Sequence, residues 1–171
     1  LCIEPYEKLY ELGAAENIHI NRLLVTYMKE SLIEKAERII RKEAVKGNTD
    51  LVPMGTILLF SGNFNKTIEY YEDDLINGSG EKLIDALYYT GRAYSGKNNY
   101  QEAMNHLSEA LEMDPDDYRV MREIGNICRD TEKYKEAEEN YKRAFSLEPD
   151  NEGLLLDLAD IYHTMEDYKK A

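Results

Sequence analysis

The sequence predicts an all-α fold, a right-handed superhelical solenoid of antiparallel helix pairs. Three observations lead to this class. Residues 87–171 repeat with a period of 34 residues, each full period holds two apolar stripes at helical spacing, and no segment shows a convincing strand pattern. A period of this length indicates a stack of supersecondary units, because one such unit cannot bury its apolar face without a neighbour.

The repeat is visible as sets of residues that recur one period apart. Small residues recur where paired helices must approach closely, and larger ones recur where the space beside them must be filled. The sets are Gly91, Gly125 and Ala159; Tyr94, Cys128 and Tyr162; Tyr100, Tyr134 and Tyr168; Ala103, Ala137 and Ala171; and Pro115 with Pro149. The register therefore holds across the whole C-terminal half.

The clearest unit shows how one helical hairpin is encoded. A first apolar stripe covers residues 87–94, a polar break follows at 95–99, and a second stripe covers 103–111. Pro115 then ends the second helix, because proline cannot continue a helix and disfavours helical geometry in the residue before it. Asp117 is a residue type that favours the start of the next helix. Each unit is therefore expected to be two helices joined by a short turn.

This pattern resembles the tetratricopeptide repeat. That family sets a large residue, then Leu-Gly or Leu-Ala, then Tyr on the first helix, and Ala, an aromatic residue, Ala and a terminating Pro on the second. The match covers residues 84–171. The tryptophan of the family pattern is replaced here by Leu87, Met121 and Leu155. The resemblance implies a solenoid in which the first helices of successive repeats line a concave groove.

Toward the N-terminus the pattern weakens but the order of residue types persists. There, Ser31–Glu34 has the sequence of a capping box that would start a helix, and Gly47 is placed to end one. We predict one continuous solenoid, with a leading helix at 1–16, a diverged helical-hairpin repeat at 17–47, a diverged tetratricopeptide repeat with a Gly/Ser loop at 48–83, repeats at 84–117 and 118–151, and a partial repeat at 152–171. Because the chain opens on Leu1 and stops inside a repeat, we expect it to be a fragment of a longer protein.

Charge and composition exclude several classes of function. The chain has 34 acidic and 21 basic residues, a net charge of -13, which argues against binding to a phosphate backbone. No apolar run approaches the roughly 20 residues that a membrane span needs. Cys2 and Cys128 stand far apart and in no metal or redox spacing, so Cys128 is interpreted as a buried, reduced thiol. We expect a cytoplasmic protein that binds neither nucleic acid nor membrane.

The resemblance places a set of candidate binding residues in the concave groove. Arginines and tyrosines recur there at helical and repeat spacing inside an otherwise acidic domain, and such a guanidinium ladder could grip a carboxylate or an acidic peptide. The candidates are Tyr88, Tyr89, Arg92, Arg119, Arg122, Asn126, Arg129, Asp157, Asp160 and His163. The alternative is that the arginines pair with Glu123, Asp157 and Asp160 across neighbouring repeats and stabilise the stack.

Other kinds of site are disfavoured by the residues present. Some members of the family bind chaperone C-termini through a clamp of Lys, Asn and Arg, and this chain lacks that set at the matching positions. Asp157, Asp160 and His163 advance in steps of three and drift round the helix without a fourth ligand. Glu102, His106 and Glu109 are better aligned on one face, but they belong to a second helix, which the family turns outward. No nucleophile–base pair or phosphate loop is present. We therefore expect no metal, no cofactor and no catalysis.

The sequence thus predicts a non-catalytic protein-interaction scaffold that holds a peptide segment or a helix of a partner in its concave groove. Two alternatives stay open: a regulatory or substrate-presenting arm of a larger enzyme whose catalytic domain lies elsewhere, and a sensor that closes on a short peptide. Self-association through the ends of the solenoid is a further possibility, because exposed solenoid ends need capping.

Overall fold

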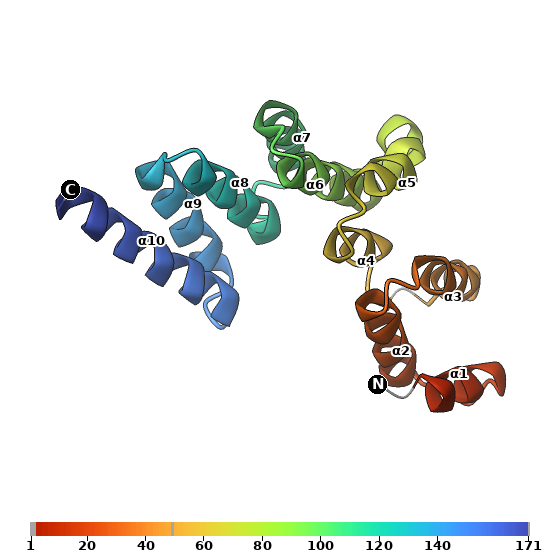
Figure 1. Ribbon diagram of the computed structural model, residues 1–171. Coiled ribbons are helices and arrows are strands. Elements are labelled where there is room, and N and C mark those ends of the chain that lie inside the picture. Colours follow the sequence, from red (N-terminus) through yellow and green to blue (C-terminus); the bar gives the residue numbers. More distant parts are fainter. Residues whose placement is uncertain (1–2, 49, 171) are drawn as a thin grey trace. The chain divides into compact units, whose positions relative to one another are not determined.

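The computed structural model describes residues 3–48 and 50–170, with side chains as far as Glu166. Cys2, Ala171 and the side chain of Tyr168 lie outside the described residues. Within them the chain forms ten helices and no strand, so the prediction of an all-α fold is confirmed (Figure 1). The helices are α1 (Glu4–Glu11), α2 (Asn17–Lys29), α3 (Ile33–Val45), α4 (Met54–Phe60), α5 (Phe64–Asn77), α6 (Glu81–Gly96), α7 (Tyr100–Met113), α8 (Tyr118–Asp130), α9 (Tyr134–Leu147) and α10 (Glu152–Lys170).

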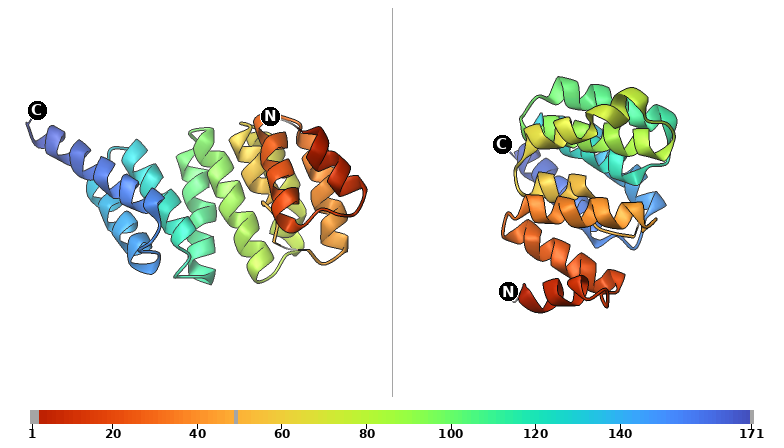
Figure 2. Two further views of the ribbon diagram at one scale, coloured as in Figure 1. Left: turned by 90° about the horizontal axis from the view of Figure 1, so that it is seen from below. Right: turned by 90° about the vertical axis from the view of Figure 1, so that its right-hand side faces the viewer.

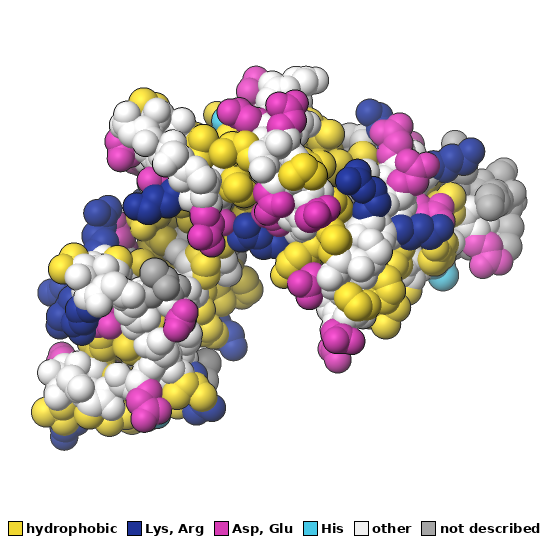
Figure 3. Space-filling view, turned by 180° about the vertical axis from the view of Figure 1, so that it is seen from behind, with side chains coloured by type: hydrophobic (Ala, Val, Ile, Leu, Met, Phe, Trp, Pro, Cys, Tyr) yellow, Lys and Arg dark blue, Asp and Glu magenta, His cyan; other side chains and the backbone are white. Residues whose placement is uncertain are grey.

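The chain divides into two compact units, residues 1–70 and 71–171, and the division falls inside α5. The N-terminal unit has nine basic and ten acidic residues, whereas the C-terminal unit has 12 basic and 24 acidic residues. The excess negative charge of the protein therefore belongs almost entirely to the C-terminal unit. On the face seen in Figure 3, acidic and basic side chains lie interspersed with hydrophobic ones.

In the C-terminal unit, α6 pairs with α7 and α8 pairs with α9 as antiparallel neighbours (Figures 1 and 2). Glycine lies where each pair is closest. A Cβ atom at Gly91 would stand 2.7 Å from Leu107, and one at Gly125 would stand 2.6 Å from the ring of Tyr141. The close packing that the small residues predicted is thus confirmed, and it leaves Leu107 and Tyr141 fully buried.

Helix α1 has no fully buried residue, and it joins the rest of the N-terminal unit through the partly buried rings of Tyr6 and Tyr10 and through polar contacts. The Tyr10 hydroxyl donates to the Glu43 carboxylate over 2.9 Å, and Glu7 accepts from the Tyr27 hydroxyl at 2.6 Å and from Lys35 at 2.9 Å. Glu43 is itself buried on α3. Two carboxylates therefore fasten α1 to α2 and α3.

We predict that acid loosens this attachment. Burial alone would raise the pKa of Glu43, but hydrogen bonds from Lys46, Tyr10 and Asn48 outweigh it and lower the pKa below the ordinary 4.5. Hydrogen bonds from Lys35 and Tyr27 likewise lower the pKa of Glu7. Groups whose pKa is lower in the folded state stabilise it above their unfolded pKa, and this contribution is lost as the pH falls through the folded pKa.

Urea unfolding followed by circular dichroism at pH 7 and pH 3.5 measures this effect. The Glu43→Gln variant should lose about 1–3 kcal/mol at pH 7, because a neutral amide replaces a buried carboxylate that accepts hydrogen bonds from Tyr10, Lys46 and Asn48. The same variant should lose less than the wild type on acidification. An identical pH dependence in the two proteins would contradict the assignment.

In four hairpins of the chain, the turn between the two helices has a residue with a positive φ angle at the equivalent position. Its φ angle is 56° at Ser31, 69° at Gly62, 58° at Asn98 and 62° at Glu132. In all four turns the next amide donates to the carbonyl five residues earlier, over 2.8–2.9 Å. This is the Schellman arrangement that ends a helix, and it recurs in both units of the chain.

The turn geometry corrects the expectation of a capping box at Ser31–Glu34. Ser31 has a positive φ, helix α3 begins two residues later, and no side chain caps it. Ser31 serves the preceding turn, so its hydroxyl is not placed to accept from the first turn of α3. A capping box does form at α2, where Glu16 and His19 exchange side-chain contacts with each other's backbone.

The left-handed position also predicts a stabilising substitution. Glu132 adopts a φ of 62°, which costs free energy for any residue with a Cβ atom, whereas Gly62 occupies the matching turn without that cost. Glu132→Gly should therefore raise the free energy of unfolding by about 0.5–1 kcal/mol. Thermal unfolding measures it, with Glu139→Gly, inside helix α9, as a control that should be destabilising.

Two further expectations can be compared with the fold. Cys128 is 5% exposed and forms no disulfide, and burial raises the pKa of its thiol. Its interpretation as a buried, reduced thiol is confirmed. Among the residues that the structure describes, no helix has both the length and the apolar character to cross a membrane.

Candidate functional site

The candidate residues lie on the first helices of the three C-terminal hairpin units. Tyr88, Tyr89 and Arg92 are on α6; Arg119, Arg122, Asn126 and Arg129 are on α8; and Asp157, Asp160 and His163 are on α10. Their positions follow the 34-residue period, so equivalent residues occur on successive first helices. We call the side of α6, α8 and α10 that carries Tyr88, Arg92, Arg122, Asn126, Arg129 and Asp160 the ladder face.

Arg119 joins α8 to α6. Its guanidinium lies 3.0 Å from the Asp85 carboxylate and 2.7 Å from that of Asp117. Asp117 also caps α8, because its side chain accepts from the backbone N–H groups of Arg119 and Val120. Hydrogen bonds to Asp117 raise the pKa of Arg119 still further above its ordinary value. One buried carboxylate therefore both starts the helix and orients its first arginine.

Tyr88 lies against two guanidinium groups. The guanidinium carbon of Arg119 is 5.0 Å from the centre of its ring, and that of Arg92 is 5.5 Å away. Arg92 also reaches Glu123 on α8, with Nε 3.5 Å from the carboxylate. Cation–π contacts of this kind stabilise by about 0.5–1 kcal/mol when partly exposed. Helices α6 and α8 are thus connected by two ion pairs and an aromatic ring between them.

Arg122 joins α8 to α10 in the corresponding way. Its Nε lies 2.5 Å from the Asp157 carboxylate, and its terminal nitrogens are 3.0 Å from the position that a Cβ atom of Gly153 would take. Gly153 occupies the position that Arg119 has one repeat earlier, so Arg122 lies over the start of α10 as Tyr88 lies over Arg119. The guanidinium is held at the contact between two repeats.

A buried tyrosine orients the Asn126 side chain. The Tyr141 hydroxyl donates to its amide oxygen over 2.9 Å, and the Asn126 amide donates to Glu123 over 3.1 Å. Burial raises the pKa of Tyr141, so the phenol stays neutral and keeps its proton for this hydrogen bond. A continuous chain of contacts therefore runs from the core at Tyr141 through Asn126 and Glu123 to Arg92.

The remaining candidates differ in accessibility. Arg129 pairs within its own helix, 3.2 Å from the exposed Asp130, and both Asp160 and His163 are exposed on α10.

The expectation that Tyr89 lies in the groove requires a correction. Tyr89 is only 4% exposed and stacks on Tyr71, with ring centres 5.2 Å apart. Its position is the one that Glu123 and Asp157 occupy in later repeats, at the contact between helices rather than at the surface.

The internal pairing weighed in the sequence is therefore present for Arg92 with Glu123 and for Arg122 with Asp157. Asp160 takes part in no ion pair among the described residues. The pair of Arg119 with Asp85 was not anticipated, although the two stand one full period apart and this spacing was a signal that could have found it.

Acidic residues and histidines stand at several exposed or half-buried positions. Within the part of the chain that the structure describes, no three His, Cys, Asp or Glu side chains lie close enough to hold an ion. His106 instead stacks on Tyr94, with ring centres 5.5 Å apart, and burial lowers its pKa.

Comparison with known protein families agrees with the periodicity. The sequence model described as "TPR repeat" matches residues 125–166, and the one described as "Tetratricopeptide repeat" matches residues 84–117. The chain contains tetratricopeptide repeats in these two segments. Among proteins of curated function, no sequence matches this chain.

Solved structures share its fold at low sequence identity. BtubC (BKLC) from P. vanneervenii has a TM-score of 0.63 and 17% identity, over 97% of this chain and 82% of that protein. The MamA RS-1 ArsTM double mutant has a TM-score of 0.53 and 14% identity, over 88% of this chain and 85% of that one. MamA MSR-1 C2 has a TM-score of 0.53 and 18% identity, over 91% and 90%. These likenesses show a common helical solenoid fold.

Tetratricopeptide repeats are in general non-catalytic interaction modules. The matched repeats accordingly support a protein-interaction scaffold as the general class of function.

Proposed function

We propose that the ladder face binds an extended segment or a helix of a partner protein, in the groove that first helices form in this family. The observation that carries the proposal is the state of the arginines. The side chains of Arg92, Arg122 and Arg129 are each 34–38% exposed although each is paired with a carboxylate. They are held in position while part of each side chain still faces solvent.

Such pre-oriented groups favour binding, because little side-chain entropy is lost when a partner arrives. Arg129 is the most available of them, since its own partner Asp130 is exposed and could exchange for a carboxylate of the ligand. Leu156, which is 65% exposed at the position equivalent to Tyr88 and Arg122, offers an apolar contact beside them. We therefore propose a partner segment with a carboxylate for Arg129 and an apolar side chain for Leu156.

Affinity capture from an extract of the source cells, read by mass spectrometry, tests this function. The bait is the wild-type chain, and it is compared with Arg129→Glu and with Arg143→Glu, which reverses an exposed arginine on the second helix α9. Partners that bind the wild type and the Arg143 variant but not the Arg129 variant would support the ladder face. Partners retained equally by both variants would contradict it.

A further inference from the structure

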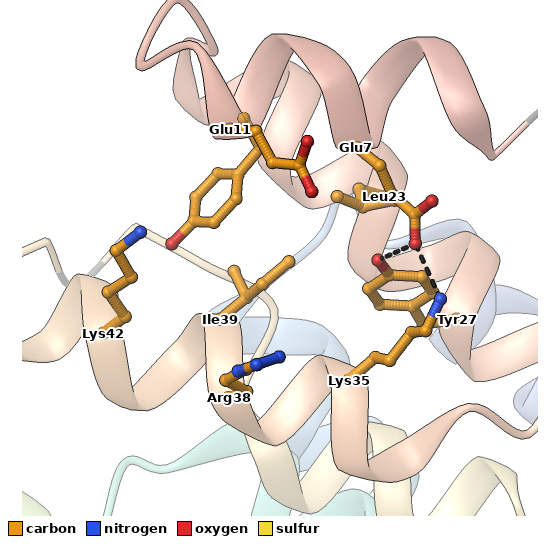
Figure 4. Close-up of a pocket in the computed structure, with 9 residues that line it drawn as sticks. Glu7, Glu11, Leu23, Tyr27, Lys35, Arg38, Ile39 and Lys42 are labelled. Atoms are coloured by element: carbon orange, nitrogen blue, oxygen red, sulfur yellow. Dashed lines mark hydrogen bonds and ion pairs between the residues drawn. The ribbon is translucent and has the colours of Figure 1, made fainter.

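A cavity of about 490 Å³ lies in the N-terminal unit between α1 and α3, with α2 behind it (Figure 4). This volume falls within the range of small-ligand sites, roughly 300–1,000 Å³. Its back is formed by the apolar side chains of Leu23 and Ile39 and by the rings of Tyr10 and Tyr27. The hydroxyls of both tyrosines donate to Glu43 and Glu7, so what the tyrosines contribute to the cavity is their rings.

Charged side chains form the two rims of the cavity. Figure 4 shows Lys35, Arg38 and Lys42 along α3, facing Glu7 and Glu11 on α1. Glu7 neutralises Lys35 over 2.9 Å. Lys42 lies over the ring of Tyr10, 5.0 Å from its centre, and no carboxylate among the described residues lies within ion-pair distance of it. The rim therefore carries three basic and two acidic groups.

Arg38 is the basic residue of the rim whose side chain has no partner among the described residues. Among the described residues it forms no ion pair, hydrogen bond or ring contact, although it points along the rim between Lys35 and Lys42 (Figure 4). Arg41, one turn further on the same helix, instead pairs with Glu37 at 2.8 Å. An arginine that is left unpaired beside an apolar cavity can donate two parallel hydrogen bonds to a carboxylate.

We propose that this cavity is a second binding site, for a segment of a partner protein in which a carboxylate stands next to an apolar side chain. The carboxylate binds Arg38 and Lys42, and the apolar side chain covers the rings of Tyr10 and Tyr27. The net charge of the rim is balanced by one negative charge. Glu7 and Glu11 would repel a dianion such as phosphate, which makes a single carboxylate the fitting group.

This site shares no residue with the ladder face. Its residues belong to α1, α2 and α3 of the N-terminal unit, whereas the ladder face belongs to the C-terminal unit. The two sites can therefore be tested and lost independently.

The probe is a fluorescent seven-residue peptide with blocked ends, Gly-Ser-Leu-Glu-Leu-Ser-Gly, with a control peptide in which Gln replaces the single Glu. Fluorescence anisotropy measures binding to the full chain. We expect the Glu peptide to bind at least about tenfold more tightly than the Gln peptide. We expect Arg38→Gln to weaken binding of the Glu peptide about tenfold relative to the wild type. Glu11→Gln should tighten binding about threefold, because it removes a repelling charge. Arg41→Gln, on the same helix, should leave binding unchanged.

Circular dichroism of each variant checks that it folds like the wild type. Equal binding of the two peptides, or unchanged binding to Arg38→Gln, would overturn the proposal. Loss of binding in Arg129→Glu alone would assign the peptide to the ladder face instead and would also overturn it. Displacement of the peptide by inorganic phosphate at equal concentration would show a general anion site, and the absence of binding at about 1 mM peptide would show no site; either result would also overturn the proposal.

Discussion

Tyr141→Ala is expected to lower the free energy of unfolding of the C-terminal unit by about 3–5 kcal/mol. Tyr141 has no exposed surface, its ring packs on Gly125, and its hydroxyl donates to Asn126. Truncation removes a large buried side chain, and Gly125 has no side chain with which to fill the space. Urea unfolding followed by circular dichroism measures the loss.

The matched variant Tyr141→Phe separates packing from hydrogen bonding. It keeps the ring and removes only the hydroxyl, so it should cost about 1 kcal/mol. It also frees Asn126 from the core, while Glu123 still holds the amide. If Tyr141→Phe were as destabilising as Tyr141→Ala, the packing of the ring on Gly125 would not be the main source of stability.

Arg122→Glu is expected to lower the free energy of unfolding by about 2 kcal/mol. The substitution places a second carboxylate against Asp157, whose side chain is only 14% exposed, and so turns an attraction between α8 and α10 into a repulsion. The half-exposed position of Arg122 keeps the loss below that of a fully buried pair.

The exchanged pair Arg122→Glu with Asp157→Arg is the control. If the pair holds the two helices together, the double variant should recover most of the stability lost by the single one. Losses that simply add would contradict a direct interaction, because independent sites show no coupling.

The 34-residue period of the sequence predicted the helical hairpins of the C-terminal half and the close contacts within them. Gly91 and Gly125 indicated where helices approach, and both lie under a large buried side chain of the paired helix. Ser31 shows the limit of local patterns. Its sequence fits a capping box, but the left-handed turn that recurs in every hairpin determines its conformation.

The candidate site was predictable in position but less so in its contacts. Periodicity placed Arg92, Arg122 and Arg129 on first helices, where they lie. It could not distinguish Tyr89, which is buried between helices, from Tyr88, because burial depends on the neighbouring repeat and on Tyr71. The sequence did not indicate Arg38 as a binding residue, because its lack of a partner depends on how the three N-terminal helices pack.

The most direct test of the central claim, that the ladder face contacts the partner, is site-specific photocrosslinking in cell extract. A photoreactive amino acid replaces Leu156 in one variant and Arg143, on α9, in the other. The account predicts that a captured partner crosslinks from position 156 and not from position 143. Crosslinking from 143 alone would place the partner on the second helices and contradict it.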